Sequence, residues 1–211
     1  MLEPAPESVS SYATPGQYVE MRIAGETGFF VLSSVPGASP WQLVMRAGGG
    51  ASDVVLAIPE GSRLDLTSAL GEGFPVAEAR GGPLLLALAG TGIAAGPPIV
   101  RGRVAEGDAS RTRVFVGVRD RADVALEPEL RAWCAAGVEV YACLSQGPVD
   151  REARGLRFAR GHVQDVVREE VAAGAASGGF VFAVGGAAMV DALRALAPVL
   201  GVEPSRVVTN Y

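Results

Sequence analysis

Lysine is absent from this 211-residue sequence, and all 18 basic residues are arginines. Schiff-base chemistry on lysine is therefore excluded, and any anion site must use arginine or backbone amides. The only two cysteines, Cys134 and Cys143, cannot form a four-cysteine zinc or iron–sulfur site by themselves, and we expect buried structural thiols. The single histidine, His162, belongs to no grouping with metal-ligand spacing, so we expect it at a helix start or on the surface.

Apolar runs long enough to span a membrane are also missing. No stretch reaches membrane-spanning length without a glycine, a proline or a charge, and residues 1–20 lack a basic segment followed by an apolar one. The composition is 49% apolar and 19% charged with a net charge of −5, which argues against disorder and against a nucleic-acid-binding surface. We therefore expect a soluble, cytoplasmic protein that binds neither nucleic acid nor membrane.

The pattern of apolar residues changes near residue 82. Before it, short β-rich runs separated by Gly and Pro turns predict a small antiparallel β-barrel. These runs are residues 18–23, 29–33, 41–45 and 63–66. After it, strand patterns alternate with helix patterns, which predicts a doubly wound parallel α/β sandwich. The strands are expected at 84–89, 113–118, 138–144 and 179–184, and the helices at 95–106, 127–136, 163–173 and 188–200. We therefore expect two domains, residues 1–82 and 83–211.

Residues 84–98 are the most informative segment, because an unbroken apolar run leads into Gly90, Thr91 and Gly92 and then into small residues. A run this apolar fits a parallel strand that is buried on both faces. The glycines let backbone amides approach a diphosphate at the start of the following helix. The segment predicts a nucleotide-binding turn, although glycine-rich turns of this kind also serve ordinary packing.

Glycines mark two further strand ends. Gly117 lies at the end of the second predicted strand, shortly before Arg119, and Gly185 and Gly186 follow the fourth, before a helix that contains Met189. Because ligands gather beyond the carboxyl ends of parallel strands, the three glycine-marked ends predict one crevice. The alternative for Gly185 and Gly186 is a tight connection that binds no ligand.

Several motifs occur in one order along the chain: PGQY at 15–18, SSVPG at 33–37, GGGASDVVLAIPEGSRLDL, GTGIAAG, VGGAAMVDAL and a terminal TNY. In this order they resemble the ferredoxin–NADP reductase superfamily, and most closely its compact group that includes plant fruit-protein-like oxidoreductases. The resemblance implies a β-barrel that binds FAD and a second domain that binds NADH or NADPH. It also implies that hydride passes from the nicotinamide to the flavin.

The resemblance implies that residues at two places in the chain contact the flavin. Gly50, Ala51 and Ser52 correspond to the start of a short helix that holds the flavin diphosphate, although Ser52 could simply cap this helix. Tyr211 corresponds to a C-terminal aromatic residue that stacks on the flavin ring, which gives it a catalytic role. The alternative for Tyr211 is that it is simply a packed or frayed end of the chain.

Part of the family's flavin site is missing. The residues that correspond to its Arg-x-Tyr-Ser pattern are Gly28, Phe29, Phe30 and Val31. The arginine and both hydroxyl groups are therefore absent. Phe30 could still pack its face against the flavin ring, and the predicted contact continues through Val31, Leu32 and Ser33. The alternative is that Phe29 and Phe30 only fill the barrel.

The family's Cys-Gly-Pro motif is replaced by Val184, Gly185 and Gly186, which would lie near the nicotinamide. Hydride transfer depends on aligned donor and acceptor atoms more than on a thiol, so Val184 keeps a place in the predicted catalytic site. Only fourteen residues precede Pro15, where the family has a full strand or two. We therefore expect an incomplete barrel whose edge is covered by a second copy or by a partner subunit.

The choice of nicotinamide cofactor depends on the loop after the third predicted strand. NADPH-preferring relatives have Ser and Arg there, whereas this chain has Ser145 and Gln146. A neutral amide cannot replace a guanidinium group for a 2′-phosphate, which favours NADH. Arg119 or Arg121 could substitute, and the alternative for both arginines is a solvated loop.

These observations favour a flavin-dependent NAD(P)H oxidoreductase that passes electrons to an unknown acceptor, such as a redox protein. A second hypothesis is a degenerate, flavin-free relative that acts as a nucleotide-binding or regulatory subunit. A third is a nucleotide-binding module that works only inside a larger electron-transfer complex.

Overall fold

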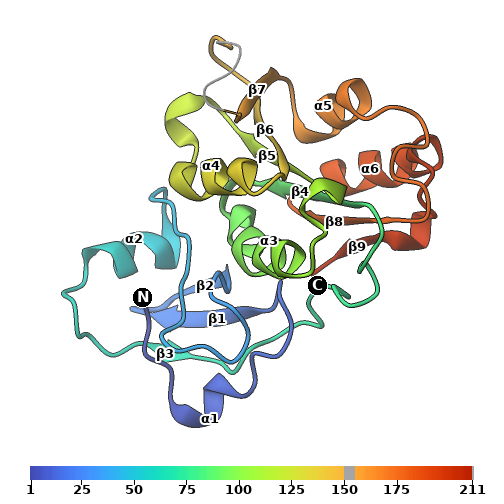
Figure 1. Ribbon diagram of the computed structural model, residues 1–211. Helices are drawn as coiled ribbons and strands as arrows, with labels where there is room; N and C mark the ends of the chain where they lie inside the picture. Colours follow the sequence, from blue (N-terminus) through green and yellow to red (C-terminus); the bar gives the residue numbers. More distant parts are fainter. Residues whose placement is uncertain (150–154, 211) are drawn as a thin grey trace.

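The computed structural model describes residues 1–149 and 155–210, which form two sheets in two lobes. Figure 1 shows the smaller N-terminal lobe below the larger C-terminal lobe. In the N-terminal lobe a three-stranded antiparallel sheet has the order β2-β1-β3, and in the C-terminal lobe a six-stranded parallel sheet has the order β7-β6-β5-β4-β8-β9. The predicted combination of an antiparallel β lobe with a doubly wound α/β lobe is therefore confirmed.

The N-terminal lobe is an unclosed antiparallel sheet. Its elements are α1 (Pro6–Val9), β1 (Tyr18–Ile23), β2 (Glu26–Val31), α2 (Gly50–Ala57) and β3 (Asp65–Leu66). Ala24 and Gly25, with φ of 49° and 83°, form the two-residue turn between β1 and β2. Alternate residues of the two strands, including Met21 and Phe30, point into a small core around the buried Trp41.

The predicted strand at 41–45 does not form. Trp41 pairs with Leu2, whereas Leu43 pairs with Leu32, and both contacts are isolated bridges. Residues two apart in this segment thus face different partners, so no continuous ladder of hydrogen bonds develops.

In the C-terminal lobe the predicted strands and helices form with small shifts at their ends. The strands are β4 (Leu84–Ala89), β5 (Thr112–Val118), β6 (Glu139–Leu144), β7 (Arg157–Arg160), β8 (Phe180–Val184) and β9 (Val207–Thr209). The helices are α3 (Gly96–Ala105), α4 (Glu127–Ala135), α5 (Val163–Glu170) and α6 (Ala187–Leu200). The sequence prediction missed β7 and β9, which are the short edge strands of four and three residues.

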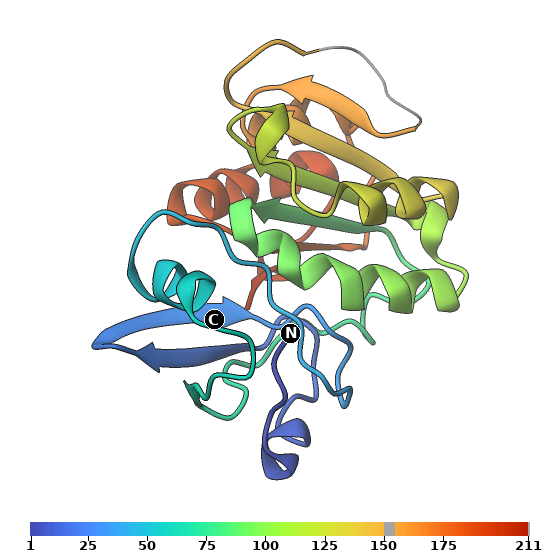
Figure 2. The ribbon, with the colours of Figure 1, turned by 90° about the vertical axis from the view of Figure 1, so that its left-hand side faces the viewer.

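Helices cover both faces of the parallel sheet, as Figure 2 shows for α3 and α4 in front of it and α6 behind it. Leu84, Leu86 and Leu88 pack with α3 and α4, whereas Leu85 and Ala87 pack with α5 and α6. Because successive side chains of a strand point to opposite faces, a strand between two helix layers must be apolar throughout. This explains the unbroken apolar run of β4. No helix in the described part of the chain is long and apolar enough to cross a membrane.

A buried arginine connects the linker between the lobes to the parallel sheet. The side chain of Arg103 is fully buried and donates to the carbonyl oxygens of Ala79 and Gly82, both at 2.6 Å. It also donates to Thr112 Oγ1 and to Asp108 Oδ2, each at 3.0 Å. Burial lowers the pKa of Arg103, and the charge of Asp108 opposes this change. The guanidinium group therefore fixes where the linker enters β4.

Two further contacts hold the N-terminal lobe against the sheet. The ring of Phe74 stacks on Phe182 of β8 with 4.8 Å between the centroids, and it covers Gly16 on the other side. At the end of the chain, Asn210 Nδ2 donates to the carbonyl oxygen of Gly16 at 2.9 Å. Gly16 thus contacts both the linker and the C-terminal segment.

We predict that Asp108→Ala lowers the free energy of unfolding by about 3 kcal/mol, because it leaves the Arg103 guanidinium buried without its counter-charge. Urea denaturation followed by circular dichroism measures this change. The control is Glu106→Ala, which removes a carboxylate that pairs with the exposed Arg80 and should change stability little. Equal effects of the two substitutions would contradict the role of the buried pair.

Candidate functional site

The candidate site lies where the strand order of the parallel sheet reverses. From β4 the chain moves outward through β5, β6 and β7, and it then returns to β8 on the other side of β4. The carboxyl ends of β4 and β8 are therefore neighbours at the switch point, where open α/β sheets bind ligands. The 90–92 turn follows β4 and begins the 3₁₀-helix η1 (Gly90–Ala95), and Gly185 and Gly186 follow β8.

Close packing explains why glycine follows β4. A Cβ atom at Gly92 would lie 2.8 Å from the carbonyl oxygen of Val184 and 2.9 Å from Val184 Cγ1. Gly90 has a φ of 56°, and a Cβ atom on it would meet nothing within 4 Å. The turn thus packs on β8 through Gly92 and leaves the surface above Gly90 open. Gly186, the residue before α6, also faces open space.

An interlobe cleft of about 440 Å³ opens between the 90–92 turn and the N-terminal lobe. Its N-terminal wall consists of Tyr18, Phe29, Phe30, Val31 and Val44, and its C-terminal wall consists of Ala89, Thr91, Gly92, Val184, Gly185 and Asn210. The structure therefore brings together some of the predicted site residues of both lobes, namely Phe30, Val31, Thr91, Gly92, Val184 and Gly185. The sequence analysis missed Tyr18 and Asn210, whose place in the cleft depends on how the lobes meet.

The two phenylalanines of β2 point in different directions. Phe29 is 65% exposed, and its ring meets Tyr18 edge to face with 6.0 Å between the centroids. Phe30 is only 8% exposed, and its ring packs over Gly28 at the edge of the cleft. The alternation of a β-strand produces this difference, and it makes Phe29 the more accessible aromatic wall.

Leu32 and Ser33 do not line the cleft. Leu32 is fully buried in the core of the N-terminal lobe. Ser33 is buried too, and its backbone N–H donates to the carbonyl oxygen of Gln42 at 2.8 Å. Tyr211, which the sequence analysis placed on the flavin ring, lies outside the described residues, whereas its neighbour Asn210 lines the cleft.

A second hollow, the strand-end groove, has a volume of about 410 Å³ and runs over the carboxyl ends of β4, β5 and β6. Four predicted binding residues line it: Gly90, Arg119, Ser145 and Met189. Arg46, from the N-terminal lobe, also lines this groove and an adjoining hollow of about 260 Å³ that includes Thr91. The sequence analysis missed Arg46 because it lies in a loop without a motif.

The thiol, imidazole and guanidinium groups in and near the groove are its candidate nucleophiles or ligand-binding groups. Burial raises the pKa of the Cys143 thiol, and the charge of Glu170 adds to this effect, so Cys143 is a neutral wall rather than a nucleophile. His162 is the residue before α5, as expected, and its backbone N–H donates to Asp165 Oδ2 at 3.3 Å. Arg121 lies over the ring of Phe158 at 4.2 Å, which leaves Arg119 as the cation at the end of β5. The described residues contain no cluster that could hold a metal ion.

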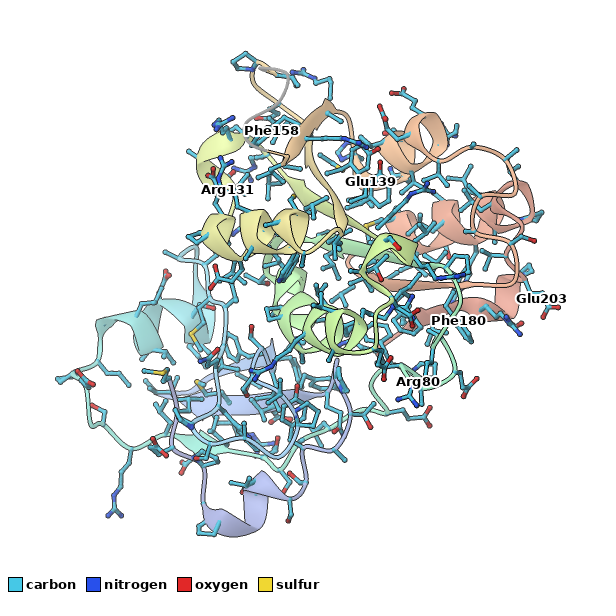
Figure 3. The ribbon with its side chains drawn as sticks, in the orientation of Figure 1. Arg80, Arg131, Glu139, Phe158, Phe180 and Glu203 are labelled. Atoms are coloured by element: carbon cyan, nitrogen blue, oxygen red, sulfur yellow. The ribbon has the colours of Figure 1, made fainter. Side chains whose placement is uncertain are left out.

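A larger hollow of about 640 Å³ lies beside β7, at the end of the sheet far from the N-terminal lobe, where Figure 3 labels Glu139 and Phe158. Arg157 in this hollow is already engaged, because it donates to Glu139 and to the hydroxyl of Tyr141. Burial and the charge of Glu139 raise the pKa of Tyr141 to about 12. The carboxylates of Glu169 and Glu170 also line this hollow, so it does not suit an anionic ligand such as a diphosphate.

The turn before α2 differs from its prediction. The residue that caps α2 is Gly49, so the alternative that Ser52 caps this helix is wrong. The backbone N–H groups of Gly48 and Gly49 donate to the two carboxylate oxygens of Asp53 at 2.9 and 2.8 Å. Two donors immediately before α2 are thus engaged within the chain.

Comparison with known proteins gives a family match and several relatives. The chain matches the family described as the oxidoreductase NAD-binding domain over residues 86–195, which is more than half of its length. The fruit protein pKIWI502 of Actinidia deliciosa is 25% identical over 226 residues, covering 99% of this chain and 69% of that protein. The ferredoxin–NAD(P)(+) reductase component of the naphthalene 1,2-dioxygenase system of Pseudomonas putida is 26% identical over 200 residues. That alignment covers 92% of this chain but only 58% of the relative.

A solved structure shows the same fold. A ferredoxin NADP+ reductase from Neisseria gonorrhoeae, crystallised with bound FAD and NADP, matches with a TM-score of 0.73 and 14% sequence identity. The match covers 97% of this chain and 88% of that chain. At this identity the likeness shows the fold alone, and it agrees with the resemblance given by the order of the motifs.

We predict that Gly92→Ala lowers the free energy of unfolding by about 1–3 kcal/mol, because the new methyl group collides with the backbone of Val184. Gly186→Ala is the matched control, since its methyl group enters open space, and it should change stability by less than about 0.5 kcal/mol. Thermal or urea denaturation compares the two variants. Equal stabilities would show that the turn does not pack on β8 as described.

Proposed function

The chain belongs to the oxidoreductase NAD-binding domain family, within the ferredoxin–NADP reductase superfamily, and we propose that it transfers hydride from NAD(P)H to a flavin. The single observation that carries this proposal is the interlobe cleft. Its aromatic wall faces the 90–92 turn and Val184, so a ring held against one wall lies next to a ligand held at the other. Hydride transfer requires this kind of fixed proximity.

The strand-end groove supports the site for NAD(P)H. The open backbone above Gly90 offers amides to a diphosphate, and Arg46 and Arg119 line the same hollows and add positive charge. Met189 lines the groove and lies next to Gly185, which lines the cleft. The nicotinamide would thus reach the cleft past Val184. In this proposal residues 83–211 bind the nicotinamide nucleotide and residues 1–82 bind the flavin.

The interlobe cleft fits the ring of a flavin. Tyr18 and Phe29 provide aromatic surface, Val31, Val44 and Val184 exclude water, and the buried amide of Asn210 offers polar atoms at the edge. A bound flavin supplies an acceptor for two electrons. The chain's own residues orient the two ligands and keep the space between them dry. Val184, where the family has cysteine, contributes contact and no proton transfer.

NADH is the nicotinamide cofactor that we propose. The strand-end groove presents Ser145 where a 2′-phosphate would need a cation, and Arg121 is held over Phe158. Arg119 is the remaining arginine at that end of β5, and it also faces the diphosphate position. One guanidinium group cannot pair fully with both the diphosphate and a 2′-phosphate. This favours NADH, which has the diphosphate but no 2′-phosphate.

Electrons pass from the flavin to an acceptor, and we propose a redox protein in this role. The P. putida relative is a ferredoxin–NAD(P)(+) reductase component, and this chain spans little more than half of its length. The unclosed sheet of the N-terminal lobe is consistent with a partner subunit or a second copy that completes it. A flavin-free regulatory subunit is the second candidate, favoured by Gly28 in place of the family's arginine.

The first test of the function is reduction of bound flavin. Protein mixed with flavin and then titrated with NADH under nitrogen should lose the visible absorbance of oxidised flavin, and NADPH should act more slowly. Because the cleft aligns the two rings, the reaction should be faster than the same mixture without protein. Binding of flavin without any reduction by either nucleotide would contradict the proposed reaction, and no binding of flavin would favour the regulatory subunit.

The second test concerns the aromatic wall. Phe29→Ala should weaken flavin binding about tenfold, because stacking of a ring on an aromatic side chain contributes about 1–3 kcal/mol. Val199→Ala, which shortens an exposed apolar side chain on α6, is the control and should leave affinity unchanged. Isothermal titration calorimetry measures both variants. Equal affinity of Phe29→Ala and the unmodified protein would place the ring elsewhere.

A further inference from the structure

The turn before α2 is closed by a carboxylate from its own helix. Gly48, Gly49 and Gly50 all have positive φ, of 148°, 114° and 63°, which turns successive backbone amides toward one side. Turns of this shape at helix starts are suited to anions. Here the anion is internal, because Asp53 accepts from the N–H groups of Gly48 and Gly49.

A second carboxylate lies beside the same turn. Glu26 Oε2 lies 3.6 Å from the position that a Cβ atom on Gly50 would occupy. Among the described residues, no arginine lies within ion-pair distance of Glu26 or Asp53. A diphosphate placed here would meet two negative charges well inside the screening distance of about 8 Å in physiological salt.

Packing around β2 also leaves no room for a long cationic side chain at position 28, which could otherwise reach the α2 turn. A Cβ atom at Gly28 would lie 2.7 Å from the ring of Phe30 and 3.1 Å from Cβ of Ala51. Phe30 itself is buried and held in the core of the N-terminal lobe. The space that a longer side chain at position 28 would cross is therefore filled. The α2 turn does not fit a diphosphate, whereas the interlobe cleft fits a ring.

Resting on the function proposed above, we infer that this chain binds flavin by its ring and selects against the diphosphate of a flavin dinucleotide. Its ligand class is accordingly a flavin without phosphate groups, such as riboflavin. Flavins of this class lack the contacts with which a dinucleotide is anchored at a helix start, so the bound flavin exchanges with flavin in solution. Asp53 is the residue that sets this preference.

Isothermal titration calorimetry with riboflavin, FMN and FAD tests the inference, first on the full chain and then on Asp53→Asn. The asparagine keeps one oxygen that can accept from Gly48 or Gly49, replaces the other acceptor with an amide NH2 group, and removes the negative charge. The unmodified protein should bind FAD no more tightly than riboflavin. Asp53→Asn should bind FAD about tenfold more tightly than the unmodified protein, with the affinity for riboflavin unchanged, because only the diphosphate meets this residue.

Two further variants make the test specific. Asp65→Asn removes the same charge from β3 in the same lobe and should alter neither affinity. Glu26→Gln should raise the affinity for FAD in the same direction as Asp53→Asn, and it replaces that variant if Asp53→Asn does not fold.

The outcomes separate this inference from the proposed function. Binding of FAD more than tenfold tighter than riboflavin by the unmodified protein, with no gain in Asp53→Asn or Glu26→Gln, would overturn the inference and leave the proposed function standing. Equal gains in Asp65→Asn would also overturn it, since net charge rather than the turn would then explain the preference. Failure to bind riboflavin, FMN or FAD would contradict the proposed function itself.

Discussion

The contact between Gly92 and the end of β8 is the constraint on which the site depends. The 90–92 turn can lie against the carbonyl of Val184 only without a side chain at position 92. β4 and β8 pair in the sheet, so their carboxyl ends lie side by side where the strand order reverses, and the Gly92 contact holds the turn against these ends. The strand-end groove and the interlobe cleft open on either side of the turn, so one packing contact positions both.

The position of the N-terminal lobe is the second requirement, and it depends on residues that are mostly outside the site. Arg103 holds the linker, Phe74 stacks on β8, and Asn210 ties the end of the chain to Gly16. Asn210 alone among these lines the cleft. A cleft between two lobes can align ligands only while such contacts keep the lobes fixed, so stability and chemistry are linked in this chain.

The sequence was sufficient for the architecture of the C-terminal lobe and for its glycine turns, since an apolar run between two helix layers and a glycine at a close contact leave clear patterns. It was not sufficient for the aromatic wall. Phe29 and Phe30 are adjacent, and only the alternation of β2 in its final register decides which ring is exposed at the cleft and which is buried in the core of the lobe. The closure of the α2 turn by Asp53 and the approach of Arg46 could not be predicted either, because both depend on the path of loops.

The central claim is that a flavin ring occupies the interlobe cleft next to the nicotinamide site. A crystal structure of the chain with bound riboflavin tests it most directly. The account predicts a ring between the Tyr18 and Phe29 pair on one side and Val184 on the other. A ring bound at the hollow beside β7, or a cleft filled by side chains with flavin bound elsewhere, would contradict it.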